Sequence, residues 1–133
     1  VVQIFQPVCR SFYMETLLIV LKLVVALGIL NVWIVRRVQP TPYRGKDAQT
    51  LREEFAAYGL PGWVYSAVGA VKIALALTLL GSIWVPALAL PAALILGGIM
   101  VVAFGMHLKV SDPAVKSLPA LAVLAMCLGI VLL

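Results

Sequence analysis

Charged side chains are scarce in this chain of 133 residues, since 11% are charged while 64% are hydrophobic. A soluble domain carries about 25% charged residues, because polar groups have to cover the surface that faces water. Ten basic and five acidic side chains cannot cover a globule of this size. The composition therefore excludes an ordinary soluble domain and predicts that lipid contacts most of the surface.

Residues that carry chemistry are also few. The chain has two cysteines, Cys9 and Cys127, and one histidine. The cysteines lie in different segments and form no Cys-X-X-Cys pair, so the sequence predicts neither a structural disulfide nor a metal site. It contains no Gly-rich phosphate loop, no paired catalytic carboxylates and no Ser/His/Asp set. No catalytic residue is assigned, and a non-catalytic protein is favoured over an enzyme.

Long hydrophobic runs are what the sequence has in abundance. A transmembrane helix needs about 20 apolar residues, and the chain has room for four such helices in a single domain over 1–133. The predicted fold class is all-α, a membrane bundle of four transmembrane helices with one short amphipathic surface helix. The segment 1–14 is too short to span and is expected to lie at the interface. The expected spans cover residues 16–35, 62–84, 87–108 and 118–133.

The amphipathic helix is predicted over 47–58, in the loop between the first and second spans. Leu51 and Phe55 are four residues apart and charged residues occupy other positions, which is typical of a helix with one apolar face. Asp47 and Thr50 are equally good N-cap residues for its start. We expect this helix to lie along the membrane surface.

Basic residues set the expected orientation. The formal net charge is +5, and most of the basic side chains gather in the loops 36–60 and 109–117. The positive-inside rule places such loops on the cytoplasmic side, or on the matrix or stromal side in an organelle. Anionic lipid headgroups account for these charges. Membrane lipid is therefore an expected partner, and nucleic acid is not.

Small residues recur at intervals of four in the second and third spans. In lipid there is no hydrophobic gain from bringing helices together, so close approach at small residues drives association. The short turn between the two spans makes them antiparallel neighbours, and we expect them to pack backbone to backbone, although alanine-rich helices also produce such rows by chance. The candidate packing residues are Gly62, Ser66, Ala70, Ala74, Thr78 and Ser82 in the second span, and Ala89, Ala93, Gly97 and Gly105 in the third.

Lys72 is the most unusual residue, because it lies ten residues into the second span. A lysine at the centre of a span costs about 2.5–3.5 kcal/mol on insertion scales. Two interpretations are open. Lys72 either faces a polar pocket that binds an anionic or quinone-like headgroup or a partner's carboxylate, or it reaches water, backbone carbonyls or lipid phosphate. Lys22, in the first span, is a second lysine of this kind.

His107 ends the third span, and its imidazole is the second candidate cofactor-binding group. A histidine near the membrane interface can bind haem iron or chlorophyll magnesium. The alternative is an interfacial anchor beside the basic loop, and no second ligand can be recognised in the sequence.

Several short motifs occur in a fixed order along the chain. In this order and spacing they resemble the DoxX-like family of small four-helix membrane proteins. The family's namesake is associated with a quinol-linked oxidoreductase complex, and other members with membrane redox or detoxification assemblies. The resemblance thus implies a four-helix bundle and supplies no catalytic motif. The motifs are Tyr58-Gly59-Leu60-Pro61-Gly62-Trp63, Val68-Gly69, Lys72-Ile73, Pro91-Ala92-Ala93, His107-Leu108-Lys109, Asp112-Pro113 and Lys116-Ser117-Leu118-Pro119-Ala120.

Three functions are compatible with these observations. The first is a non-catalytic accessory subunit of a larger respiratory or photosynthetic membrane complex, which packs against other integral membrane subunits. The second is a quinone-linked redox subunit of a membrane oxidoreductase, with Lys72 and His107 near the headgroup. The third is a small transporter, which would have to oligomerise because four short helices enclose little volume.

Overall fold

The computed structural model describes residues 12–133, apart from the side chain of Asp47. Within this range every regular element is helical and four helices are long and apolar enough to cross a membrane, which confirms the predicted fold class. The prediction for residues 1–11 lies outside the described residues. The long helices are α2 (Phe12–Leu30), α4 (Gly62–Gly81), α5 (Ala89–Lys109) and α6 (Leu118–Leu132), and the short surface helix is α3 (Leu51–Ala57).

Short non-α turns adjust the ends of these helices. Residues 12–14, expected at the interface, form the first turn of α2, and a π-helical turn, η1 (Asn31–Val35), follows that helix. The 3-10 turns are η2 (Gly45–Asp47), η3 (Pro86–Leu88) and η4 (Ala114–Ser117). Because η4 leads directly into α6, the last apolar segment covers Ala114–Leu132, or 19 residues. This is long enough to span, whereas the sequence predicts only 16 residues.

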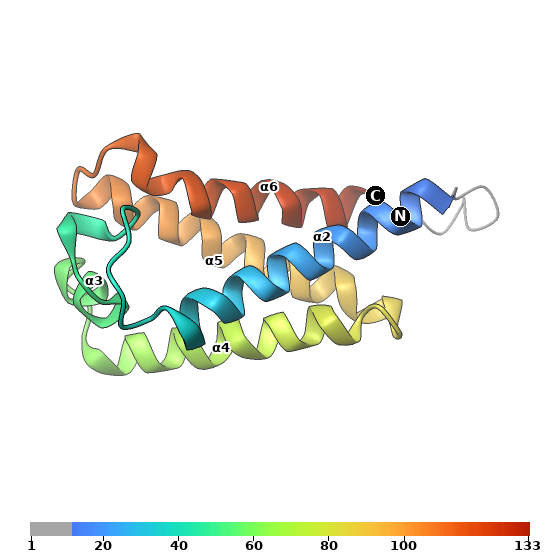
Figure 1. The fold of residues 1–133 in the computed structure, drawn as a ribbon, viewed down its shortest axis with the longest axis horizontal. Coiled ribbons are helices and arrows are strands. Elements are labelled where there is room, and N and C mark those ends of the chain that lie inside the picture. The colour runs from blue at the N-terminus through green and yellow to red at the C-terminus, as the bar shows by residue number, and fades with distance from the viewer. Residues whose placement is uncertain (1–11) are drawn as a thin grey trace.

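The four long helices form a closed ring. α2 contacts α4 and α6, and α5 contacts the same two helices from the other side. They run side by side in Figure 1, with α3 and the basic loops at one end and the C-terminus beside the start of α2 at the other. Small residues fill much of the contact surface, which lets backbones approach closely in lipid. The buried small residues of the long helices include Ala26, Gly69, Ala76, Ala92, Ala93, Gly97 and Cys127.

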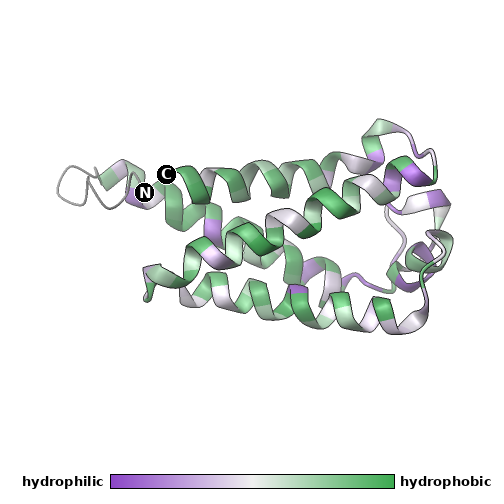
Figure 2. Cartoon of the chain, turned by 180° about the vertical axis from the view of Figure 1, so that it is seen from behind, coloured by the Kyte–Doolittle hydropathy of each residue, from purple (hydrophilic) through white to green (hydrophobic). Residues whose placement is uncertain are grey.

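The outer surface of the ring is apolar. Large hydrophobic side chains are exposed along all four long helices, whereas hydrophilic residues concentrate at the α3 end (Figure 2). In water such a surface would cause aggregation. It is the surface expected of a helix bundle that lipid surrounds.

The row of small residues on α4 does not make the predicted contact with α5. Gly62, Ser66, Ala70 and Ala74 are exposed, Thr78 is half-buried and only Ser82 is buried. The reason is geometric, because each step of four residues turns about 40° beyond a full helical turn, or about 200° over the whole row. The row therefore starts outside the bundle and ends inside it. The buried face of α4 is instead Gly69, Lys72, Ala76, Leu79 and Ser82.

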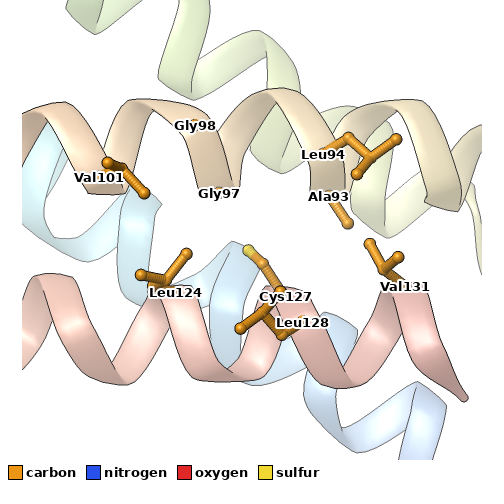
Figure 3. Close-up of a pocket in the computed structure, with 9 residues that line it drawn as sticks. All are labelled: Ala93, Leu94, Gly97, Gly98, Val101, Leu124, Cys127, Leu128 and Val131. Carbon is orange, nitrogen blue, oxygen red and sulfur yellow. The ribbon is translucent and has the colours of Figure 1, made fainter.

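The small residues of α5 also pack differently from the prediction. Ala89 is half-buried and Gly105 is exposed, with nothing within 4 Å of a Cβ built there. A Cβ at Gly97 would lie 3.7 Å from Cys127 and from Leu124, so this glycine faces α6 rather than α4. Ala93 and Gly97 line an apolar groove of about 190 Å³ between α5 and α6 (Figure 3).

The surface helix starts at the later of its two predicted positions. Thr50 is the N-cap of α3, and its hydroxyl accepts a hydrogen bond from the Glu53 N–H at 3.1 Å. The helix has one buried face, and Leu51 and Glu54 lie on it. The sequence pattern assigned Glu54 to the outer side. The burial of Glu54 is the main local departure from the prediction, and it places a carboxylate at the centre of the candidate functional site.

Candidate functional site

Lys22 has a structural role within the bundle. Its side chain is buried, and its ammonium donates a hydrogen bond to the Ser82 carbonyl at 3.3 Å. Ser82 is the C-cap of α4. A cation at this position interacts favourably with the negative end of the helix dipole. Lys22 therefore joins α2 to the end of α4, and this contact accounts for a lysine inside the first span.

Lys72 lies near the middle of α4, about ten residues before the C-cap that Lys22 contacts. Its side chain is 9% exposed, and its ammonium lies 5.2 Å from the centre of the Trp33 ring. Such a cation–π contact contributes about 2 kcal/mol when desolvated. Within residues 12–133 no carbonyl or carboxylate accepts a hydrogen bond from Lys72, and Glu54 acts on it only through longer-range electrostatics. Lys72 and Trp33 are thus paired through a ring face, and the ammonium makes no hydrogen bond with the part of the chain that the structure describes.

An aromatic cluster surrounds Trp33. The Trp33 ring stacks on Tyr65 at 5.5 Å between centroids and meets Phe55 edge-on at 5.6 Å. Trp33 belongs to the π-helical turn η1, a rare conformation that often occurs at functional sites. Gly69 provides the space, because a Cβ there would lie 2.8 Å from two carbons of the Trp33 ring. The cluster links η1, α3 and α4.

His107 lies between two carboxylates. Its Nδ1 is 2.8 Å from Oδ2 of Asp112, and its Nε2 is 3.8 Å from Oε1 of Glu54. The Tyr58 hydroxyl lies 3.4–3.5 Å from both ring nitrogens. These side chains come from α5, the turn after it, α3 and the C-cap of α3, so the imidazole joins the first basic loop to the second.

Glu54 is the centre of this buried polar cluster. Its Oε1 accepts hydrogen bonds from the Tyr58 hydroxyl at 2.6 Å and from the Gly45 N–H at 3.1 Å. Its Oε2 is 3.6 Å from the Arg44 guanidinium, which also donates to the carbonyls of Arg36 and Gln39. Buried charges are tolerated when they are paired and hydrogen-bonded in this way. The Arg44 Nε is buried and has no hydrogen-bond partner among the described residues.

Two pKa shifts follow from this geometry. Burial raises the pKa of Tyr58, and the neighbouring Glu54 carboxylate raises it further. Burial alone would raise the pKa of Asp112, but hydrogen bonds from His107 and the Lys46 N–H, with Lys116 nearby, hold it below its ordinary value. At neutral pH Tyr58 is therefore a protonated donor and Asp112 is an anion.

The two predicted cofactor-binding residues are linked by rings. Trp33 contacts Phe55, Phe55 contacts Tyr58 and Tyr58 contacts the His107 ring. Lys72 at one end of this array and His107 at the other thus border one aromatic region. The sequence pattern did not predict Arg44, Glu54, Tyr58 and Asp112 as members of the cluster. The signal for Glu54 and Tyr58 is their spacing of three and seven residues from Leu51, which places them on the apolar face of α3.

The cluster does not suit an axial ligand of haem or chlorophyll. An axial imidazole must expose one ring nitrogen to the metal, but the His107 residue is 6% exposed, and both of its nitrogens face polar groups of the cluster. In the part of the chain that the structure describes, no group of three or more His, Cys, Asp and Glu residues is arranged to hold a metal ion. His107 instead organises the two loops.

Four apolar helices in a closed ring, with a buried polar cluster at one end, define a small multi-pass membrane protein. The model of the DoxX-like family matches residues 44–130. The chain belongs to this family, and the matched residues include the whole polar cluster together with α3, α4 and α5. Comparisons with curated proteins and with solved structures give no match.

Proposed function

We propose that the protein is a non-catalytic accessory subunit that stabilises a larger membrane complex through helix packing. The observation that carries the proposal is the exposed face of α4 formed by Gly62, Ser66, Ala70 and Ala74. In a bilayer, rows of small residues let another helix approach closely, and van der Waals contact then holds the two together. The Arg52 side chain of α3 lies against Gly62, but among the described residues no helix of this chain covers Ser66, Ala70 and Ala74, so a helix of another subunit fits there.

The polar cluster supports a structural rather than a catalytic role. Its carboxylates and its imidazole contact one another and the loop backbone, and these contacts hold the two basic loops together. The association of the family's namesake with a quinol-linked complex makes a respiratory or photosynthetic complex the proposed partner. In that arrangement the basic loops would face the cytoplasm, the matrix or the stroma, following the positive-inside rule.

Larger side chains in the exposed row of α4 should disrupt the complex without unfolding the subunit. We expect Ala74→Leu, and more strongly Ala70→Leu with Ala74→Leu, to abolish co-migration with a larger assembly on a native gel in mild detergent. The thermal unfolding temperature of the isolated chain should not fall, since Ala70 and Ala74 are exposed within it. Ala125→Leu, the same change at an exposed position of α6, should leave assembly intact. A wild-type chain that migrates alone under these conditions would refute the proposal.

A second candidate function is supported by one specific observation: the buried Lys72 ammonium lies beside an aromatic cluster and donates no hydrogen bond to any residue in 12–133. A quinone presents carbonyl oxygens to such a donor and a flat ring to aromatic faces. We therefore propose, as the alternative, a subunit that contacts quinone at Lys72.

Lys72→Met should remove quinone binding if this alternative holds. The isolated protein in detergent would be titrated with a short-chain quinone by isothermal calorimetry. We expect a loss of affinity of at least about tenfold, because a hydrogen bond from a charged donor contributes about 1.5–3 kcal/mol. Lys22→Met is the control: it should lower thermal stability by removing the contact with the Ser82 carbonyl, yet keep quinone binding. Absence of binding to the wild-type chain would exclude the candidate.

A further inference from the structure

The burial of acidic side chains changes the surface charge at the α3 end. Among the described acidic side chains there, Glu54 and Asp112 lie inside the polar cluster, and Glu53 is exposed. Among the described cations at this end, Arg44 is buried within the cluster and Lys116 is half-buried beside Asp112. Five basic residues remain exposed and form what we call the basic end surface: Arg36, Arg37, Lys46, Arg52 and Lys109.

Hydrogen bonds bring the segments that carry these residues together around α3. The Leu51 N–H donates to the Arg37 carbonyl at 2.8 Å, so the end of α2 meets the start of α3. The Lys109 ammonium donates to the Tyr58 carbonyl at 2.9 Å at the other end of α3. The Lys46 N–H donates to Asp112 at 3.0 Å, which brings the η2 turn to the turn after α5. Residues from three segments of the chain therefore gather at one end of the bundle, the end at which Figure 2 shows most of the hydrophilic positions.

The ends of the spans indicate the depth at which the basic end surface lies in the bilayer. Arg36 directly follows η1, and Lys109 is the last residue of α5. The Arg52 guanidinium lies against the first residue of α4, 3.3 Å from a Cβ built on Gly62. Trp63, in the first turn of α4, is 73% exposed. An exposed tryptophan beside cations at span ends marks the level of the lipid headgroups.

We propose that the basic end surface binds the phosphate groups of anionic phospholipids in the surrounding bilayer. Each basic residue near the headgroups attracts anionic lipid, and the attraction adds over a cluster. The internal cluster makes this possible, because it removes two carboxylates that would otherwise face the same headgroups. A bilayer is the occupant that the position favours, since the cations stand where the apolar spans end.

The test compares lipids of equal chain length and different headgroup charge. The intact wild-type protein would be placed in mixed micelles of phosphatidylglycerol and phosphatidylcholine, and its retained lipids would be counted by native mass spectrometry. We expect a preference for phosphatidylglycerol that declines as salt is raised. The triple variant Arg36→Gln, Arg37→Gln and Arg52→Gln should lose about fivefold in preference for each cation removed.

The controls show whether the preference depends on the positive charge, on an intact fold, and on a phospholipid instead of another anion. The triple variant Arg36→Lys, Arg37→Lys and Arg52→Lys keeps the charge and should keep the preference. All three side chains are exposed, so the unfolding temperature of either variant in phosphatidylcholine should match that of the wild type. An equal count of both lipids on the wild type would overturn the proposal, as would an unchanged preference in the glutamine variant. Displacement of the lipid by inorganic phosphate or a short acidic peptide at equal concentration would also overturn it, because the surface would then serve another anion.

Discussion

Replacing Glu54 with glutamine should lower the free energy of unfolding in detergent by about 3 kcal/mol. Its carboxylate is 3.6 Å from the buried Arg44 guanidinium and accepts hydrogen bonds from Tyr58 and from the Gly45 N–H. The amide keeps the shape but removes the negative charge, so the Arg44 charge stays buried with carbonyl oxygens as its remaining partners. Thermal unfolding in micelles, followed by tryptophan fluorescence, measures the loss.

Two variants show whether the charge pair causes this effect. Glu53→Gln changes the neighbouring exposed carboxylate and should cost less than about 1 kcal/mol, since surface charges contribute little. Arg44→Met combined with Glu54→Gln should be less unstable than the sum of the two single changes, because neither charge is then left unpaired. Equal unfolding temperatures for Glu54→Gln and Glu53→Gln would contradict the buried pair.

The long elements of the fold could be predicted because a bilayer makes strict demands on composition. Four apolar runs of about 20 residues have few alternatives to spanning helices. The starts of the third and fourth spans shifted because the 3-10 turns η3 and η4 extend them, whereas the predicted end of the first span coincides with the end of η1. The predicted surface helix exists, but it is shorter than 47–58 because Thr50, rather than Asp47, is its N-cap.

The site was less accessible to sequence reasoning, because its members are distant along the chain. His107 contacts Glu54 and Tyr58, which lie about fifty residues earlier in the sequence, and no local spacing of residues indicates such a contact. Glu54 resembles a solvated charge next to Glu53 until the helix is placed against its neighbours. The row of small residues on α4 was recognised, but its drift around the helix carries most of the row away from α5. Lys72 was found because a lysine in a span is conspicuous by itself.

Gly69→Ala tests the aromatic half of the site and should lower the free energy of unfolding by about 1–3 kcal/mol, the usual cost of overpacking a core. The added Cβ would lie 2.8 Å from two carbons of the Trp33 ring. That ring is buried and held by Phe55 and Tyr65, with Lys72 at its face, so it cannot move aside without breaking these contacts. Thermal unfolding in micelles provides the measurement.

Gly81→Ala is the matched control, because Gly81 lies at the end of the same helix and a Cβ there meets nothing within 4 Å. Alanine restricts the unfolded backbone more than glycine does, so this change should raise stability by up to about 1 kcal/mol. Opposite signs for one substitution at two positions of α4 would show that contact with Trp33, rather than helix propensity, decides the outcome. If Gly69→Ala unfolds at the wild-type temperature or above it, Trp33 does not pack against α4 and Lys72 loses its ring partner.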